Sequence, residues 1–215
     1  RHRFWRCDQR LGQGGKAITP WPSITAIVPA RNEAETIGAC ATSILDQDYG
    51  GELRLIVVND SSEDETAVHA REAMMQSTRE GVVLDAPSLQ PGWSGKLWAL
   101  SHGVAQAGGD SEYFWFSDAD IVHEPEVLSK LVFNAQCGER GLVSLMVKLR
   151  TQSFLEKLIV PAFIFFFQKL YPFPAINNPK SHIGGAAGGC VLIKRKALDK
   201  IGGLSAIKDR LIDDC

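Results

Sequence analysis

The chain has few cysteines, and none of the five stands close to another in the sequence. It contains no C-x-x-C pair and no cysteine and histidine cluster with the spacing of a zinc site. Its five histidines form no triad-like or metal-binding pattern either. These absences argue against a zinc centre and indicate a reducing compartment in which the thiols are buried or inert.

An excess of charge of one sign is also missing. Lys and Arg together number 23 and Asp and Glu number 25, for a formal net charge of -2. This balance provides no bulk electrostatic attraction for nucleic acid, so we expect no nucleic-acid partner. Hydrophobic residues make up 45% of the 215 positions and charged residues 22%, which excludes a disordered or fibrous protein. A chain of this length suits one domain with a substantial core.

No apolar run is long enough to span a bilayer as a helix. The longest, residues 158–167 (LIVPAFIFFF), has ten residues, and a spanning helix needs about twenty. We therefore expect it not to cross a membrane. Because Lys157 and Lys169 flank the run, it could lie in a membrane interface, and a buried core helix is the alternative. Pro161 disfavours a regular, fully buried helix.

The familiar phosphate-binding loops are absent as well. The segment GWSGKL lacks the G-x-x-x-x-G-K-[ST] spacing, and the glycine-rich residues 184–189 do not fit G-x-G-x-x-G. These departures argue against a P-loop NTPase and against an NAD-dependent dehydrogenase.

Apolar, β-rich runs alternate with segments of helical period along the chain. The predicted strands are residues 24–29, 53–59, 81–85, 112–117 and 141–149. The predicted helices are residues 33–45, 62–79, 96–107, 124–137 and 195–201. Ser62 and Glu65 have the spacing of a capping box at the start of the second helix. The pattern predicts an α/β fold whose mostly parallel sheet is covered by helices on both faces.

Polar residues follow several of these strands directly. Residues 29–33 (PARNE) follow the first, Asp60 follows the second, and Asp118 and Asp120 follow the fourth. Ligands of open α/β sheets bind beyond the carboxyl ends of the strands. We therefore expect the site at this edge of the sheet.

Asp118 and Asp120 form a D-x-D motif in which both carboxylates can face one hard cation. Mg²⁺ and Mn²⁺ prefer oxygen ligands and are often held by one or two carboxylates, with phosphate and water completing the shell. An Asx-turn and helix cap ahead of the helix at 124–137 is the alternative interpretation of this motif.

Other charged residues have two possible interpretations each. Asp60 could accept a hydrogen bond from a nucleobase or cap the next helix, and Ser62 is the better cap. Arg31 and Lys96 could contact diphosphate oxygens or be solvated surface charges. The late acidic pair at 213–214 could supply a general base or be a charged tail.

Six segments together resemble an inverting family 2 glycosyltransferase. They are IVPARNEAETI, VVNDSSEDET, GWSGKLWAL, FSDAD, GGAAGGCVLIKRKALDKIGG and LIDD. Within that family the sequence is most similar to the hopene-associated glycosyltransferases of bacterial hopanoid biosynthesis. The resemblance implies a GT-A (Rossmann-like) fold, a nucleotide-sugar donor, guessed to be a UDP-sugar, and Mn²⁺ or Mg²⁺ as cofactor.

The resemblance also implies roles for individual residues. Asp60 would contact the nucleobase, Asp118 and Asp120 would bind the metal and diphosphate, and Lys96 would lie near the phosphates. Asp214, with Asp213 beside it, would be the catalytic base. The residues expected to line the nucleotide pocket are Pro29, Ala30, Arg31 and Glu33. Two positions depart from the usual family motifs: Asn59 replaces a common Asp, and Asp213 replaces a common Glu.

The resemblance further implies the layout and setting of the protein. We expect a juxtamembrane segment over 1–22 and a catalytic domain over 23–215, truncated before a C-terminal membrane region. The basic and aromatic start RHRFWR favours the juxtamembrane segment, and a frayed, solvated terminus is the alternative interpretation. The expected location is the cytoplasmic face of the bacterial inner membrane, with a hopanoid-type lipid as acceptor. Ceramide, diacylglycerol, polyprenyl phosphate or polysaccharide acceptors, a nucleotidyltransferase and a non-catalytic nucleotide-sugar binding module are the alternatives.

Overall fold

The computed structural model describes residues 8–12, 19–149 and 151–208. Its centre is a six-stranded sheet in the order β3-β2-β1-β4-β6-β5. The strands are β1 (Ile24–Ala30), β2 (Leu53–Asn59), β3 (Gly81–Asp85), β4 (Tyr113–Ser117), β5 (Leu142–Ser144) and β6 (Cys190–Lys194). β3, β2, β1 and β4 pair in parallel, whereas β6 is antiparallel to both β4 and β5. The predicted α/β fold with a mostly parallel sheet is confirmed.

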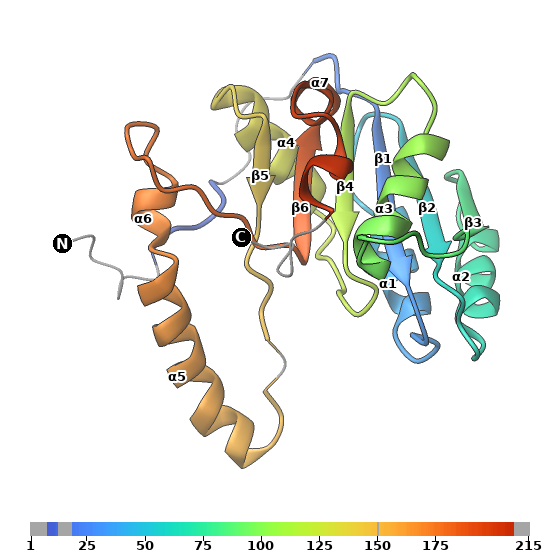
Figure 1. Ribbon diagram of the computed structural model, residues 1–215, viewed down its shortest axis with the longest axis horizontal. Helices are drawn as coiled ribbons and strands as arrows, with labels where there is room; N and C mark the ends of the chain where they lie inside the picture. Colours follow the sequence, from blue (N-terminus) through green and yellow to red (C-terminus); the bar gives the residue numbers. More distant parts are fainter. Residues whose placement is uncertain (1–7, 13–18, 150, 209–215) are drawn as a thin grey trace.

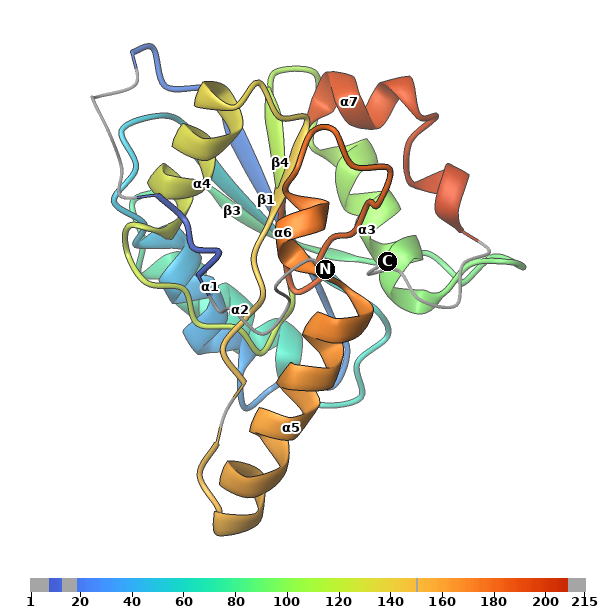
Figure 2. The ribbon, with the colours of Figure 1, turned by 90° about the vertical axis from the view of Figure 1, so that its left-hand side faces the viewer.

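Helices cover both faces of the sheet, as Figure 2 shows with the sheet between two layers. The helices are α1 (Ile37–Leu45), α2 (Thr66–Met75), α3 (Gly95–Gln106), α4 (Val127–Cys137), α5 (Phe154–Leu170), α6 (Phe173–Ile176) and α7 (Arg195–Lys200), followed by the 3-10 helix η1 (Leu204–Ile207). One core cluster joins the sheet to α1, α2 and α4, and a second joins it to α3, α7 and η1.

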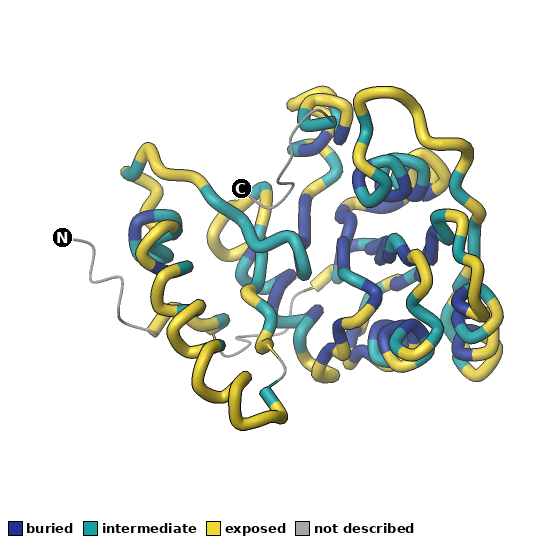
Figure 3. Tube along the Cα trace, turned by 60° about the horizontal axis from the view of Figure 1, so that its bottom comes forward, coloured by how far each residue is buried: buried dark blue, intermediate teal, exposed yellow. Residues whose placement is uncertain are grey.

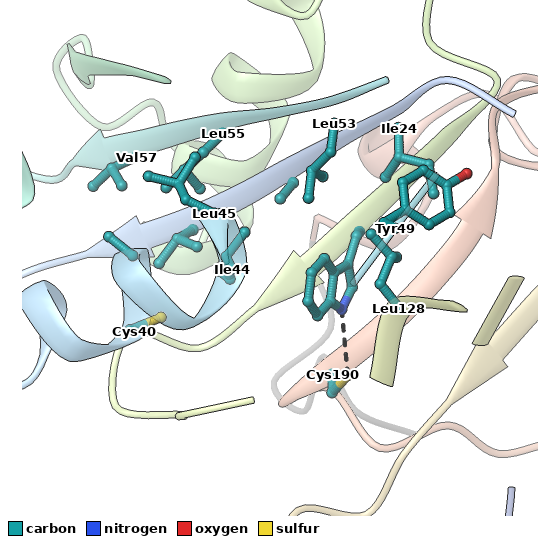
Figure 4. Close-up of a cluster of buried hydrophobic side chains, with 14 of the residues drawn as sticks. Ile24, Cys40, Ile44, Leu45, Tyr49, Leu53, Leu55, Val57, Leu128 and Cys190 are labelled. Atoms are coloured by element: carbon teal, nitrogen blue, oxygen red, sulfur yellow. Dashed lines mark hydrogen bonds between the residues drawn. The ribbon is translucent and has the colours of Figure 1, made fainter. Parts of the chain in front are cut away.

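Successive residues of the central strands contribute to opposite clusters because side chains alternate across a strand. In β1, Ala26 and Val28 join the first cluster and Ile27 joins the second. Figure 4 shows the first cluster, where the indole nitrogen of Trp115 donates a hydrogen bond to the sulfur of Cys190 over 3.4 Å. Because these strands are buried on both faces, polar and apolar residues hardly alternate along them.

β6 is the strand that the sequence-based prediction missed, and β5 is shorter than predicted. The run CVLIK was not assigned because it directly precedes the helix at 195–200. The predicted strand at 141–149 is regular only over Leu142–Ser144. Beyond it, Leu145 and Val147 still pack against the first core cluster, and the amide of Leu145 donates to the carbonyl of Cys190. The chain then leaves the sheet.

The predicted capping box at the start of α2 is wrong. The helix begins at Thr66, four residues after Ser62. The Ser62 hydroxyl instead accepts a hydrogen bond from the amide of Asn32, and Asp64 accepts from the amide of Thr66. The Ser62 side chain thus binds a neighbouring loop, whereas Asp64 binds the first residue of the helix.

α5 departs from the alternative interpretation of a buried core helix. Its 17 residues extend well beyond the ten-residue apolar run, and Gln168 is its buried residue. Figure 3 shows the helix as an almost continuous exposed rod beside the body of the molecule. By length and composition, the segment Phe154–Ile176 could cross a membrane, and 11% of its apolar window is buried. The buried-core alternative for residues 158–167 is therefore wrong.

His123 is buried among apolar side chains at the carboxyl end of β4. Its Nε2 lies 2.7 Å from the hydroxyl of Ser117, and its ring centroid lies 4.6 Å from that of Trp115. Burial disfavours the charged imidazolium and lowers the pKa of His123 from 6.5 to about 4.

This burial predicts a loss of stability in mild acid. Between about pH 6.5 and pH 4 the unfolded chain binds a proton at His123 that the folded chain does not. The free energy of unfolding should therefore fall with decreasing pH in this window, by up to about 3 kcal/mol. Urea unfolding at pH 7 and pH 4.5 measures the fall, and His123→Gln should reduce it. An equal fall in the variant would contradict the assignment.

Candidate active site at the carboxyl edge of the sheet

The polar residues predicted to form a site follow three neighbouring strands, β2, β1 and β4. The amide of Asp60, just after β2, donates to the carbonyl of Ala30 at the end of β1 over 2.8 Å. The amide of Asp118, just after β4, donates to the carbonyl of Gly189 over 3.1 Å. Asp60 and Asp118 thus directly follow the last paired residues of their strands, at the edge where parallel sheets bind ligands.

Two loops at this edge are joined by hydrogen bonds. Asn32 in the loop after β1 donates its amide to the Ser62 hydroxyl over 3.1 Å and accepts from the amide of Glu63 over 2.8 Å. Asn32 has φ 55 and Ser61 has φ 56, in the left-handed region that few non-glycine residues adopt. These contacts keep the two strand-end loops together without a ligand.

Asp64 and Thr66 complete the connection between the loops. Asp64 accepts hydrogen bonds from the amide of Ala34 over 3.1 Å and from the amide and hydroxyl of Thr66. The Thr66 hydroxyl also accepts from the amide of Glu33 over 2.8 Å. The hydrogen bond from the Thr66 hydroxyl, followed by those from backbone amides, lowers the pKa of Asp64. The loop that carries Asp60 is therefore positioned by neighbouring side chains.

Asp60 lies between Arg31 and the first residue of α3. Its Oδ2 is 3.8 Å from Nη1 of Arg31, and 16% of its side chain is exposed. A Cβ at Gly95 would lie 2.7 Å from the same Oδ2, closer than real Cβ contacts come. The Asp60 carboxylate therefore occupies space that any side chain at Gly95 would need.

The next residue of α3 reaches the second carboxylate. Nζ of Lys96 lies 3.0 Å from Oδ1 of Asp118, and both side chains are about one third exposed. The hydroxyl of Ser94 caps the helix by accepting a hydrogen bond from the amide of Leu97. The first turn of α3 therefore contacts Asp60 with one residue and Asp118 with the next, which brings both carboxylates to one place.

Asp118 and Asp120 supply oxygen ligands of the kind that Mg²⁺ and Mn²⁺ prefer. Asp120 is exposed, and Asp118 is partly exposed. Within the part of the chain that the structure describes, no three His, Cys, Asp or Glu residues form a metal-binding group. Two carboxylates fit a metal that takes its remaining ligands from a diphosphate and water, rather than an all-protein site.

The alternative roles of the D-x-D motif and of Asp60 as helix caps are not supported. α4 begins at Val127 with Glu126 as its N-cap residue, seven residues after Asp120, and has no side-chain cap. α2 begins at Thr66 and likewise has no side-chain cap from Asp60. None of these three carboxylates therefore caps α2 or α4.

The remaining predicted site residues are partly accounted for. Ala30 is buried at the end of β1, and Pro29 is half-buried beside it. Glu33 is half-buried, and its carboxylate accepts a hydrogen bond from the Thr36 hydroxyl over 2.8 Å. The predicted base Asp214 and its neighbour Asp213 lie outside the described residues.

Three residues at this edge were missed as site residues. Gly189 is one: it directly precedes antiparallel β6, which starts where β4 ends, and a Cβ added to it would lie 3.4 Å from Oδ2 of Asp118. Gly95 is another, through its approach to Asp60. Asp85 ends β3 and accepts a hydrogen bond from the Asn59 amide group over 2.8 Å. The rule that polar residues follow strands could have found Asp85, whereas the glycines gave no signal without a three-dimensional arrangement.

Solved structures with the same fold are glycosyltransferases. A mannosyltransferase from Pyrobaculum calidifontis, in complex with GDP-Man and Mn²⁺, matches with a TM-score of 0.63 and 24% identity, over 86% of this chain and 48% of that chain. Glucosyl-3-phosphoglycerate synthase from Mycobacterium tuberculosis, in complex with Mn²⁺, UDP-Glc and phosphoglyceric acid, matches with a TM-score of 0.54 and 25% identity, over 82% and 58%. The chain has a GT-A fold.

Residues 25–202 match the family described as Glycosyl transferase family 2. The chain belongs to glycosyl transferase family 2. The resemblance found in the sequence is thereby confirmed at the level of the family.

Curated relatives agree with this family. An N-acetylglucosaminyltransferase of Rhizobium meliloti (strain 1021) is 36% identical over 126 residues, 58% of this chain and 28% of that protein. The 4,4'-diaponeurosporenoate glycosyltransferase of Staphylococcus aureus (strain bovine RF122 / ET3-1) is 37% identical over 136 residues, 62% of this chain and 34% of that protein. The chain thus covers about a third of the length of these relatives.

The contact between Gly95 and Asp60 predicts opposite results for two substitutions of glycine by alanine. Gly38 lies within α1 with nothing within 4 Å of an added Cβ, so Gly38→Ala should stabilise the fold by about 0.4–1 kcal/mol. Gly95→Ala should destabilise it, because the new methyl group meets the Asp60 carboxylate. Urea unfolding measures both changes.

A third variant isolates the cause of that difference. In a chain that already carries Asp60→Ala, the methyl group of Gly95→Ala no longer meets a carboxylate. The double variant Gly95→Ala/Asp60→Ala should therefore be no less stable than Asp60→Ala alone. If Gly95→Ala stabilises the chain as Gly38→Ala does, the close approach of Asp60 to α3 does not exist.

Proposed function

We propose that this chain carries the catalytic site of a membrane-associated inverting glycosyltransferase that moves a sugar from a nucleoside diphosphate to a lipid acceptor. The observation that carries the proposal is the first turn of α3, which contacts Asp60 through Gly95 and Asp118 through Lys96. A nucleotide sugar presents a base, a diphosphate and a sugar in that order. Two carboxylates that follow β2 and β4, the strands on either side of β1, match a ligand of this extended shape.

Each described residue has a physical role in donor binding under this proposal. Asp60, mostly buried and paired with Arg31, accepts a hydrogen bond from the nucleobase edge. Arg31 and Lys96 supply charge-assisted hydrogen bonds to the diphosphate. Lys96 is paired with Asp118, so it lies next to the predicted metal ligand. Pro29, Ala30 and Glu33 line the nucleotide pocket.

Asp118 and Asp120 would hold Mn²⁺ or Mg²⁺. When bound, such an ion supplies positive charge that stabilises the departing diphosphate. The two carboxylates place hard oxygen ligands at the edge of the sheet where the diphosphate binds. Both solved neighbours described above are complexes with Mn²⁺, which supports this choice of ion.

Asp214, with Asp213 beside it, is proposed as the base that removes the proton from the acceptor hydroxyl. The hydroxyl then attacks the anomeric carbon opposite the leaving diphosphate, so a single displacement inverts the configuration. The assignment rests on the resemblance of LIDD to the family motif.

The acceptor is proposed to be a hopanoid-type lipid. The Staphylococcus aureus relative is named for 4,4'-diaponeurosporenoate, which favours a lipid over a polysaccharide. The proposed location is the cytoplasmic face of the bacterial inner membrane. We propose further that 1–22 is a juxtamembrane segment and that 23–215 is a catalytic domain within a longer membrane protein.

Nucleotide binding tests the donor site. Calorimetric titration of UDP and of GDP into the chain, with and without Mn²⁺, should show metal-dependent binding of one nucleotide, with UDP expected. Asp120→Ala should weaken this binding at least tenfold, because one metal ligand is lost. Asp60→Asn should weaken it without abolishing the dependence on Mn²⁺.

A matched control comes from the opposite end of β4. Asp110 is exposed and precedes the strand, so Asp110→Ala removes the same charge far from the carboxyl edge and should bind like the parent chain. Equal affinity of Asp120→Ala and the parent chain, or metal-independent binding in both, would refute the assigned site.

Product analysis tests the acceptor separately. The full-length protein, supplied with a labelled nucleotide sugar, should transfer label to a hopanoid in preference to ceramide, diacylglycerol, polyprenyl phosphate or a polysaccharide. Transfer only to a polymer would refute the lipid acceptor. Release of pyrophosphate from a nucleoside triphosphate and a sugar phosphate would favour a nucleotidyltransferase.

A further inference from the structure

α5 exposes an apolar face. Eight large apolar side chains of this helix are between 46% and 80% exposed: Phe154, Leu155, Leu158, Ile159, Phe163, Phe165, Phe166 and Leu170. At about 100° per residue, these positions fill one half of the helix circumference. A patch of this kind marks a docking surface.

The other half of α5 is less exposed. Gln168 is buried there, and Val160, Ile164 and Phe167 are half-buried. Near the C-terminal end of the helix, the ring centroid of Phe167 lies 4.8 Å from that of Tyr171 and 6.4 Å from that of Phe173 in α6. Near its C-terminal end α5 thus packs against the segment that directly follows it, while its apolar side is exposed.

The sequence around α5 is basic although the chain as a whole is slightly acidic. Residues 148–180 contain five Lys and Arg residues and one acidic residue, which leaves 18 basic and 24 acidic residues in the rest of the chain. The acidic residue, Glu156, accepts hydrogen bonds from the amides of Gln152 and Ser153 in a capping box. The surface therefore combines apolar area with positive charge.

We propose that α5 lies in the plane of an anionic phospholipid bilayer, with its exposed apolar face buried at the boundary between headgroups and acyl chains. Basic residues beside an apolar helix face complement anionic headgroups. Eleven residues separate Lys157 from Lys169, about 16 Å of helix, whereas the hydrocarbon core is about 30 Å thick. The helix therefore lies along the surface, with both lysines at headgroup level.

The position of Lys169 favours a bilayer over a second copy of this chain. Lys169 is exposed and follows the apolar face at its C-terminal end, flanked on the helix surface by Phe165 and Phe166. In a helix pair its ammonium group would be buried against apolar side chains, which is costly without a partner. In a membrane interface the long side chain extends to the headgroups.

This inference rests on the proposed function in one respect, the delivery of a lipid acceptor to the site. Figure 1 shows α5 extending past the edge at which β4 ends. From α6 the chain passes through the glycine-rich residues 184–189 to β6, and Gly189 accepts the hydrogen bond from Asp118. The segment that follows α5 and α6 therefore leads from the helix to the edge of the sheet that carries the carboxylates.

Vesicle binding tests the inference without donor or acceptor. Co-sedimentation of the chain with phosphatidylcholine vesicles that contain 30% phosphatidylglycerol should show binding that weakens in pure phosphatidylcholine. Phe163→Ser/Phe166→Ser should weaken binding by on the order of a hundredfold, because two exposed rings no longer insert. Lys157→Gln/Lys169→Gln should weaken binding to the anionic vesicles about thirtyfold.

Matched controls remove similar groups elsewhere. Met75→Ser/Leu89→Ser deletes two exposed apolar side chains, and Lys194→Gln/Lys200→Gln deletes two exposed charges, all outside α5. Both control variants should bind vesicles like the parent chain. Absence of binding, equal losses in the α5 and control variants, or a concentration-dependent dimer abolished by Phe163→Ser/Phe166→Ser without vesicle binding would each overturn the proposal.

Labelling of the two helix ends tests the orientation. Lys157→Cys and Lys169→Cys, made separately after Cys7, Cys137 and Cys215 are replaced by serine, place a thiol at headgroup level near either end of α5. A membrane-impermeant maleimide added outside the vesicles should modify both positions. Protection of one end until the vesicles are lysed would show a spanning helix and overturn the in-plane arrangement. Vesicle binding with no sugar transfer would refute the proposed function alone.

Discussion

The pairing of β1 between β2 and β4 is the constraint on which the rest of the structure depends. Both pairs are parallel, so the three strands end at one edge of the sheet. A shift of one residue would exchange Val28 and Ile27 between the two core clusters, and packing on both faces opposes this. The positions of Asp60 and Asp118 are therefore determined by apolar packing some distance from them.

The first turn of α3 converts this shared edge into a site. Val58 and Ile27 of the sheet pack against Gly103, further along α3, and so determine how closely the helix lies on its face. The same helix then brings Gly95 to Asp60 and Lys96 to Asp118. The separation of the two carboxylates thus depends on the packing of one helix as well as on the spacing of the strands.

Sequence reasoning could find what local patterns encode, and it failed where the decisive contact is distant in the chain. The apolar runs predicted β1, β2 and β4, and the polar residues after them located the edge where Asp60 and Asp118 lie. β6 was missed because a five-residue strand directly before a helix has no pattern of its own. For α5, an apolar composition fits both a core and a membrane surface, and only the burial of its side chains distinguishes them.

The direction of β6 connects α5 to the site. A strand parallel to β4 would begin at the opposite edge of the sheet, and its preceding segment would be far from Asp118. Because β6 is antiparallel, Cys190 pairs with Ser117 and the residues before it must pass the D-x-D turn. Those residues come directly from α5 and α6. An acceptor that enters from a lipid surface at α5 would therefore approach the edge with the carboxylates without crossing the sheet.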